Sequence, residues 1–158
     1  MECVAPSDDD LWARSIDCRY RNLYQPYDLP RSCALSELDE PRERPETLHR
    51  VMLVAGEVAA TGRLDLQPAN PAGSGAQLRY CAVEPKFRGR GVGQALVRSF
   101  EEEARARGLG RVWMEARVAA LNFYLRLGYT DIGEGPLKWG LILHRVLEKR
   151  LDEDPLTR

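Results

Sequence analysis

The stretch Arg88-Gly89-Arg90-Gly91-Val92-Gly93 places three glycines between two regular segments of the chain. An apolar segment typical of a strand, Leu78 to Val83, precedes it, and an amphipathic helical pattern begins near Val92. Glycine adopts positive φ at little cost and leaves no Cβ in the way of a ligand. Because free N–H groups at a helix N-terminus attract anions, this context predicts a turn that binds phosphate.

A tight strand-to-helix turn without a ligand is the alternative interpretation, and a bare G-x-G would favour it. Several successive glycines between a strand and a helix favour phosphate binding instead. Two rival phosphate motifs do not fit. No Gly-Lys-Ser/Thr follows the glycines, which excludes a P-loop, and Leu96 stands where a dinucleotide fingerprint needs its third glycine.

The composition is that of one compact domain. The 158 residues are 44% hydrophobic, enough to bury a core, so we expect one domain over residues 1–150 and a charged tail over 151–158. The formal net charge of −1 argues against a general attraction to nucleic acid or an anionic membrane. The acidic N-terminus lacks the apolar region of a signal peptide, and no apolar run approaches a membrane-spanning length. We therefore expect a cytoplasmic protein.

The four cysteines are scattered along the chain and include no C-x-x-C pair; they are Cys3, Cys18, Cys33 and Cys81. Only His49 and His144 are present to complete a metal site. This pattern favours reduced thiols over a disulfide or zinc framework, and no metal is expected.

Hydrophobic periodicity and turn residues predict an alternation of helices and strands. We expect helices over residues 8–24, 92–108 and 119–127, and strands over 47–55, 58–66, 76–83, 111–116, 129–132 and 137–147. The last of these strands is expected to be interrupted near Gly140. Ser7 is the expected start of the first helix, and Gly56-Glu57 is the expected hairpin turn. Residues 25–46 carry four prolines and are expected to form a lid or a loop with a short helix over 32–38. A second turn-rich stretch is expected over 68–75.

Three motifs at a consistent spacing resemble the GNAT family of N-acetyltransferases. Arg88-x-x-Gly91-x-Gly93 fits the family's cofactor motif, which reads Arg or Gln, two residues, Gly, one residue, Gly or Ala. Upstream, Cys81-Ala82-Val83-Glu84-Pro85 is similar to the apolar strand that ends in Val-x-Pro. Downstream, Asn122 to Tyr129 is similar to a short helix bearing Asn and Tyr, followed by Leu-Gly-aromatic. These blocks cover about residues 78–132.

The resemblance implies an α/β (α+β) fold with a mixed, mostly antiparallel twisted sheet of six to seven strands and about four flanking helices. Acetyl-CoA would occupy a V-shaped splay between the strands at 78–83 and 111–116. The pantetheine arm would pair with the backbone of Cys81, Ala82 and Val83. The pyrophosphate would be held at the glycine turn and the start of the helix. The residues expected there are Arg88, Gly89, Arg90, Gly91, Val92, Gly93 and Gln94.

Acetyl transfer to an amine needs a deprotonated nucleophile, stabilisation of an oxyanion and a proton for the departing thiolate. The resemblance implies that Tyr124 is the general acid near the CoA sulfur, and a core tyrosine is the alternative. Asn122 would orient the pantetheine or a nearby main-chain group, or would be a helix-surface amide. The oxyanion would lie near the backbone N–H of Val83 or Cys81.

The general base is not evident from the sequence. Glu84 and Glu115 are the nearest carboxylates, and we interpret each as a solvated or ion-paired residue. A water chain, or an amine that arrives neutral, is an equal alternative. By resemblance His144 would line the acceptor pocket, and otherwise it is a hydrogen-bonded core or edge residue. Cys81 has no neighbouring His or Lys to activate it, so direct transfer is preferred to a covalent relay.

Two hypotheses for the function follow. The first is an acetyl-CoA-dependent N-acetyltransferase that acts on an amino group of a small molecule, peptide or protein. The second is a non-catalytic acyl-CoA sensor or interaction protein with the same fold. A nucleic-acid module would need a clustering of arginines that the net charge does not suggest.

The acceptor stays open at the level of sequence. Four acidic residues of the 25–46 segment would attract a cationic amine or are solvated surface; they are Asp39, Glu40, Glu43 and Glu46. The oligomeric state also stays open, although homodimers are common among the proteins that the chain resembles.

Overall fold

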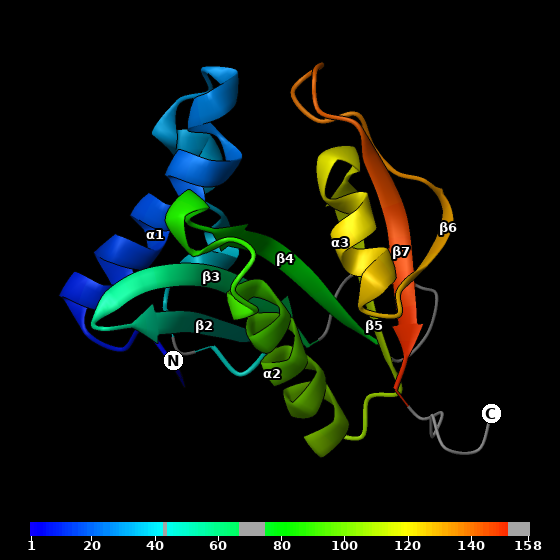
Figure 1. Ribbon diagram of the computed structural model, residues 1–158, viewed down its shortest axis with the longest axis horizontal. Coiled ribbons are helices and arrows are strands. Elements are labelled where there is room, and N and C mark those ends of the chain that lie inside the picture. Colours follow the sequence, from blue (N-terminus) through cyan, green and yellow to red (C-terminus); the bar gives the residue numbers. More distant parts are fainter. Residues whose placement is uncertain (43, 67–74, 152–158) are drawn as a thin grey trace. The chain divides into compact units, whose positions relative to one another are not determined.

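The computed structural model describes residues 1–42, 44–66 and 75–151 (Figure 1). Seven strands form one mixed sheet in the order β1-β2-β3-β4-β5-β7-β6, which confirms the expected fold class. The strands are β1 (Glu2–Val4), β2 (Thr47–Val54), β3 (Glu57–Asp65), β4 (Ala76–Val83), β5 (Arg111–Arg117), β6 (Thr130–Glu134) and β7 (His144–Arg150). The α-helices are α1 (Asp9–Leu23), α2 (Val92–Ala106) and α3 (Leu121–Arg126).

The chain divides into two compact units. The first comprises residues 1–66 and 78–100, and the second comprises 67–77 and 101–158. The expectation of a single domain over residues 1–150 stays a prediction. The turn-rich stretch expected over 68–75 lies outside the described residues apart from Gly75, and so do residues 152–158 of the expected tail.

The antiparallel strands β1, β2 and β3 belong to the first unit. β2 and β3 match their expected ranges within a residue or two, and Ala55 and Gly56 form the turn between them with φ of 50° and 80°. The expected turn residues, Gly56-Glu57, are therefore wrong by one position. A two-residue turn that matches the twist of its strands needs positive φ at both central residues, and Ala55 and Gly56 supply it.

Helix α1 begins one residue later than the sequence indicates. Asp8 is the N-cap, because its side chain accepts a hydrogen bond of 2.7 Å from the N–H of Leu11. The backbone N–H of Ser7 is instead bonded to the carbonyl of Ala5 in the turn before the helix. Ser7 and Asp8 are both suitable N-cap residues. Because Ser7 belongs to the turn before the helix, Asp8 takes the N-cap position. The expected cap at Ser7 is thus wrong.

Helix α2 crosses β3 at Gly62 (Figure 1). A Cβ at this position would lie 3.0 Å from the Phe100 ring and 3.1 Å from the Cys81 sulfur. Glycine therefore permits the close approach of helix and strand. The apolar face of α2 that the sequence indicates is buried, with Leu96 and Phe100 at most 1% exposed.

The second unit contains β5, β7 and β6, each paired antiparallel with the next. The first residues of β4 also pair with β5, in parallel, at Ala76 and Gln77. The strand expected over 137–147 is interrupted near Gly140, as the sequence indicates, and the residues before His144 are not part of it. Trp139 and Gly140 have φ of 57° and 69°, so the chain reverses in a small hairpin that pairs Lys138 with Ile142. The final strand, β7, begins only at His144.

Within residues 25–42 and 44–46 the structure has three short 3-10 helices, η1 (Gln25–Tyr27), η2 (Arg31–Ala34) and η3 (Glu37–Asp39). The single helix expected over 32–38 is wrong. Ser36 is extended, with φ of −130° and ψ of 149°, and it caps a new turn whose Asp39 carboxylate accepts from the Ser36 N–H. This capping box separates η2 from η3.

Asp39 anchors this segment through buried ion pairs. Its carboxylate accepts from Arg19 of α1 and from Arg63 of β3, each at 3.0 Å. Arg63 also forms a two-point contact with Asp65, at 2.7 and 3.0 Å. These four side chains are at most 5% exposed. The interpretation of Asp39 as part of a solvated acidic surface is therefore wrong, because two cations from other elements enclose it.

Burial opposes ionisation of Asp39, but Arg19, the Ser36 N–H and Arg63 hold its pKa below the ordinary range of an aspartate. A depressed pKa in the folded state contributes stability above the pKa of the unfolded chain, and this stability is lost as the pH falls through the folded value. The pair is therefore fully stabilising at neutral pH.

No helix in the described ranges is both long and apolar enough to cross a membrane.

Replacing Asp39 by asparagine should lower the free energy of unfolding at pH 7 by about 3–5 kcal/mol, because it leaves two buried guanidinium groups underpaired. Urea denaturation followed by circular dichroism measures the loss. The difference from the wild type should shrink below about pH 4, where the unfolded chain binds a proton at Asp39.

Asp131→Asn is the matched control, since Asp131 pairs with Arg145 at 3.0 Å but both side chains are partly exposed. Its effect should be much smaller. An equal effect of the two substitutions would contradict the importance of burial.

Candidate functional site

The glycine turn lies between β4 and α2 in the first unit. β4 covers the expected residues, Ala76–Val83, and a 3-10 turn at Pro85–Phe87 leads from it to the glycines. Gly89 and Gly91 have φ of 77° and 78°, and no atom lies within 4 Å of a Cβ built on either. The backbone conformation, rather than a lack of space, therefore requires glycine at these positions.

Helix α2 starts at Val92, directly after the left-handed Gly91. The first N–H groups of an α-helix have no partner within the helix, and they carry its partial positive charge. The turn therefore has the form that the sequence predicts for a phosphate site, with open space around Gly89 and Gly91 and the N-terminus of a helix next to them.

Arg88 does not extend into solvent as an isolated charge. Its Nε donates to the carbonyl of Val83 at 3.1 Å, and its Nη2 donates to Asn22 Oδ1 at 3.3 Å. The side chain thus ties the turn to the end of β4 and to α1. Arg90 lies over the Phe87 ring, with its guanidinium carbon 5.6 Å from the ring centre.

Tyr80 interrupts β4 just before Cys81, Ala82 and Val83. Its φ of 58° places a bulky residue in the left-handed region, which costs about 1–2 kcal/mol. Two buried guanidinium groups contact its ring, Arg19 at 4.1 Å and Arg63 at 4.9 Å. These contacts hold the strained residue in place, and sequence reasoning missed them because the partners are distant along the chain.

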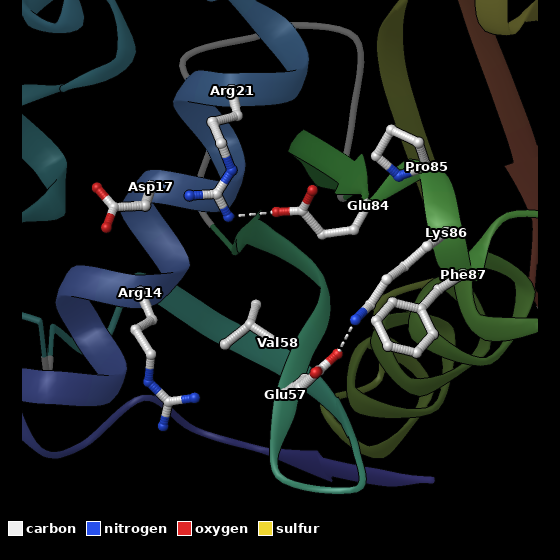
Figure 2. Close-up of a pocket in the computed structure, with 9 residues that line it drawn as sticks. All are labelled: Arg14, Asp17, Arg21, Glu57, Val58, Glu84, Pro85, Lys86 and Phe87. Carbon is white, nitrogen blue, oxygen red and sulfur yellow. Dashed lines mark hydrogen bonds and ion pairs between the residues drawn. The ribbon is translucent and has the colours of Figure 1, made fainter.

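A pocket of about 560 Å³ opens beside the turn, within the first unit (Figure 2). Its lining residues come from α1, the start of β3 and the segment after β4; they are Arg14, Asp17, Arg21, Glu57, Val58, Glu84, Pro85, Lys86 and Phe87. Two ion pairs join lining residues: Arg21 contacts Glu84 at 2.5 Å, and Lys86 contacts Glu57. The interpretation of Glu84 as an ion-paired residue is therefore confirmed.

The cysteines are free thiols in the structure. Cys18 is fully buried, and burial together with the nearby Glu84 raises its pKa to about 12. A thiol with so high a pKa is a poor nucleophile at neutral pH. Among the described residues, no group of three or more His, Cys, Asp or Glu side chains could hold a metal ion.

Tyr124 and Asn122 belong to the second unit, on α3. Tyr124 is 7% exposed and packs edge-on against Phe123 and Tyr129, with ring centres 5.0 and 5.9 Å away. Asn122 is exposed on the helix surface. The structure thus gives Tyr124 the packing of a core residue, which is compatible with either interpretation of its role.

Tyr129, behind Tyr124, is fixed by a buried carboxylate. Its hydroxyl donates to Glu101 at 3.0 Å, and Lys149 contacts the same carboxylate at 3.1 Å. Glu101 is 3% exposed although it lies on the charged face of α2 in the sequence pattern. The sequence carries no local signal for this cluster.

His144 is 7% exposed at the start of β7. Its Nδ1 lies 3.0 Å from the carbonyl oxygen of Pro136 and 2.9 Å from that of Ile142. Since carbonyl oxygens only accept, Nδ1 carries the hydrogen and Nε2 carries the lone pair of the neutral ring. Burial and the nearby Lys138 lower the pKa of His144, so the ring is neutral at pH 7.

Glu115, on β5, lies 3.2 Å from the Lys138 ammonium, although the contact lacks hydrogen-bond geometry. The interpretation of Glu115 as an ion-paired residue is therefore confirmed.

Solved structures resemble the whole chain. An aminoglycoside 6'-N-acetyltransferase complexed with coenzyme A has a TM-score of 0.77 at 20% identity, covering 98% of this chain and 99% of the other. The ribosomal-protein-S18-alanine N-acetyltransferase of Escherichia coli has a TM-score of 0.72 at 19% identity, with 97% and 95% covered. At such identities the likeness shows the fold.

Relatives in sequence match shorter stretches. The glucosamine 6-phosphate N-acetyltransferase of Trypanosoma brucei brucei is 30% identical over 76 residues, which are 47% of this chain and 52% of the relative. The streptothricin acetyltransferase of Streptomyces lavendulae is 37% identical over 54 residues, 32% of this chain and 29% of that protein. The chain thus matches at most about half the length of these relatives.

The model of the acetyltransferase (GNAT) family matches residues 11–129. This range includes β4, the glycine turn, α2 and the short helix with Tyr124. The match covers most of the chain, and the geometry of the turn agrees with it. The chain therefore belongs to the GNAT family of acetyltransferases.

Proposed function

We propose that this protein is an acetyl-CoA-dependent N-acetyltransferase that transfers the acetyl group directly to an amino group. The observation that carries the proposal is the pair of left-handed glycines between β4 and α2, in a chain of the GNAT family. The activities of the relatives named above support an acetyl group as the transferred group and acceptors that include amino sugars and aminoglycosides. No observation favours a non-catalytic sensor.

In this proposal the cofactor lies along the end of β4. The backbone of Cys81, Ala82 and Val83 pairs with the pantetheine arm. The pyrophosphate accepts from N–H groups between Gly89 and Gln94, where the α2 dipole favours negative charge. Arg88 has a supporting role, because its guanidinium already donates to Val83 and Asn22. Asn122 orients the pantetheine, as its exposure allows.

The amine attacks the thioester carbonyl, and the thiolate of CoA leaves. Tyr124 is the proposed general acid and donates its phenolic proton to the sulfur. His144 is the proposed base that takes a proton from the attacking amine. Its fixed tautomer supports this role, because Nδ1–H is held by two carbonyls and Nε2 remains basic. A lowered pKa keeps that nitrogen deprotonated at neutral pH.

We place the reaction in the cytoplasm, where acetyl-CoA and reduced thiols coexist.

Gly91→Ala should weaken acetyl-CoA binding at least tenfold, because the left-handed turn that presents the N–H groups is strained by a Cβ. Isothermal titration calorimetry with acetyl-CoA measures the affinity. Gly56→Ala is the matched control: Gly56 has φ of 80° and equally open space, but it lies in the β2–β3 turn. It should lose similar stability and no affinity. Unchanged binding by Gly91→Ala, or no binding by the wild type at micromolar concentrations, would refute the cofactor site.

Tyr124→Phe should lower kcat about 100-fold while the Kd for acetyl-CoA stays the same, because only the proton donor is removed. Release of CoA, followed with a thiol reagent over a panel of amines, measures kcat. In the control Tyr129→Phe, a buried hydrogen bond to Glu101 is lost, so stability should fall without a comparable loss of kcat. Full activity of Tyr124→Phe would exclude it as the acid.

His144→Gln should lower kcat and remove the acid limb of its pH profile. A base is active when deprotonated, so the rate rises with pH through its pKa, and for His144 this limb should lie below about pH 6.5. The profile must be recorded with one amine for both proteins, because the amine adds its own limb. An identical acid limb in wild type and variant would rule out His144.

A further inference from the structure

A second cavity, of about 330 Å³, lies in the first unit and shares no lining residue with the proposed cofactor segment. Its walls are the residues before α1, the residues before β2 and the first half of β2; they are Ala5, Pro6, Ser7, Arg42, Arg44, Pro45, Thr47, Leu48, His49 and Arg50. Its volume falls at the lower end of the range of about 300–1,000 Å³ that is typical of small-molecule sites.

Three hydrogen-bonding atoms of this wall have no partner within the described ranges: Thr47 Oγ1, His49 Nε2 and Arg42 Nη1. Thr47 is only 2% exposed and His49 only 6%, so bulk water has little access to either side chain. Buried polar groups are nearly always paired in folded proteins. Three orphaned atoms at one cavity therefore point to a ligand that supplies hydrogen-bond acceptors.

Guanidinium groups dominate the charge of the wall. The carboxylates that pair with Arg42 are Asp9 and Glu40, whose side chains are 95% and 64% exposed. Arg44 contacts Glu46, which is 37% exposed. Because ion pairs with exposed partners contribute little free energy, a ligand oxyanion can replace these carboxylates at small cost.

His49 reports the electrostatic environment of the cavity. Burial, and the positive charges of Arg19, Arg63 and Arg50, lower its pKa to about 4 against the opposing effect of Asp39. The Trp12 ring packs edge-on against the imidazole, with centres 4.8 Å apart, and fixes its plane. The ring is therefore neutral at pH 7 and can donate through one N–H in a locally positive field, which favours an anion.

We propose that this cavity binds the phosphate group of a small molecule, with Thr47, His49 and Arg42 as donors. A phosphate presents acceptor oxygens in a tetrahedral arrangement, which can meet donors that come from different directions. A carboxylate presents two oxygens in one plane. Arginine in addition binds phosphate through a fixed pair of N–H groups. This site is separate from the glycine turn, so it does not depend on the proposed acetyl transfer.

The two histidines of the chain allow a direct test, because His49 lies in the first unit and His144 in the second. Inorganic phosphate is titrated into the full chain at pH 7, with sodium chloride at equal ionic strength as the reference, and the imidazole signals are followed by NMR. The His49 signals should move saturably and those of His144 should not. At saturating phosphate the pKa of His49 should rise by about one unit or more, because a nearby anion favours the imidazolium.

Thr47→Val tests the donors without removing a charge. The variant should fold at least as well as the wild type, because it deletes an unpaired buried hydroxyl, and it should need about tenfold more phosphate for half-saturation. Thr61→Val is the matched control on β3: Thr61 is 4% exposed, and its hydroxyl donates to the Arg50 carbonyl at 3.4 Å. It should keep the wild-type response to phosphate.

Each of the following results would overturn the proposal. The first is that phosphate moves the NMR signals of His49 no more than those of His144, or no more than sodium chloride does. The second is that Thr47→Val responds to phosphate as the wild type does. The third is that acetate binds as tightly as phosphate. Phenyl phosphate distinguishes a site for a phosphate ester from a site for the free ion. If it binds at least as tightly as inorganic phosphate, the small-molecule ligand is supported. If phenyl phosphate does not bind, the proposal is overturned.

Discussion

The shared carboxylate of Asp39 is the interaction on which the first unit depends. It joins η3 to Arg19 of α1 and to Arg63 of β3, and both guanidinium groups also lie against the ring of Tyr80 on β4. Buried charges are tolerated only when they are paired, so none of these elements can shift without leaving a charge uncompensated. The η3 turn is consequently anchored to α1 and β3.

The same contacts explain how β4 can be both a strand and a strained segment. Tyr80 is left-handed, and such strain persists only where the surroundings hold it, often at functional sites. Here it directly precedes Cys81, Ala82 and Val83, and the left-handed Gly89 and Gly91 follow. The segment proposed to pair with the pantetheine arm, Cys81 to Val83, thus lies between residues with positive φ. In the proposed complex the main-chain groups of this segment bind the cofactor, and side chains have a supporting role.

Much of the fold follows from local patterns. β4 and the start of α2 agree with the sequence because turn residues and periodicity act within a few positions. An error of one position arises over the same short range, because Asp8 replaces Ser7 as the cap of α1. The interruption expected near Gly140 is a full turn at Trp139 and Gly140, so that β7 begins only at His144. In the candidate site the glycine turn was predictable, whereas the tautomer of His144 depends on two carbonyls that only the folded hairpin brings to it.

The sequence by itself determined the strand, the glycine turn and the helix that follow one another at the proposed acetyl-CoA site, because turn residues and hydrophobic periodicity act between neighbouring positions of the chain. Only the tertiary structure decided the rest. Asp39 is separated by 20 residues from Arg19 and by 24 from Arg63, and it could as well have been a solvated charge. The folded chain also buries Thr47 and His49 in one cavity wall, where Thr47 Oγ1 and His49 Nε2 have no hydrogen-bond partner among the described residues. Whether a polar side chain is hydrated or paired depends on which distant segments exclude water from it, and no local pattern records that.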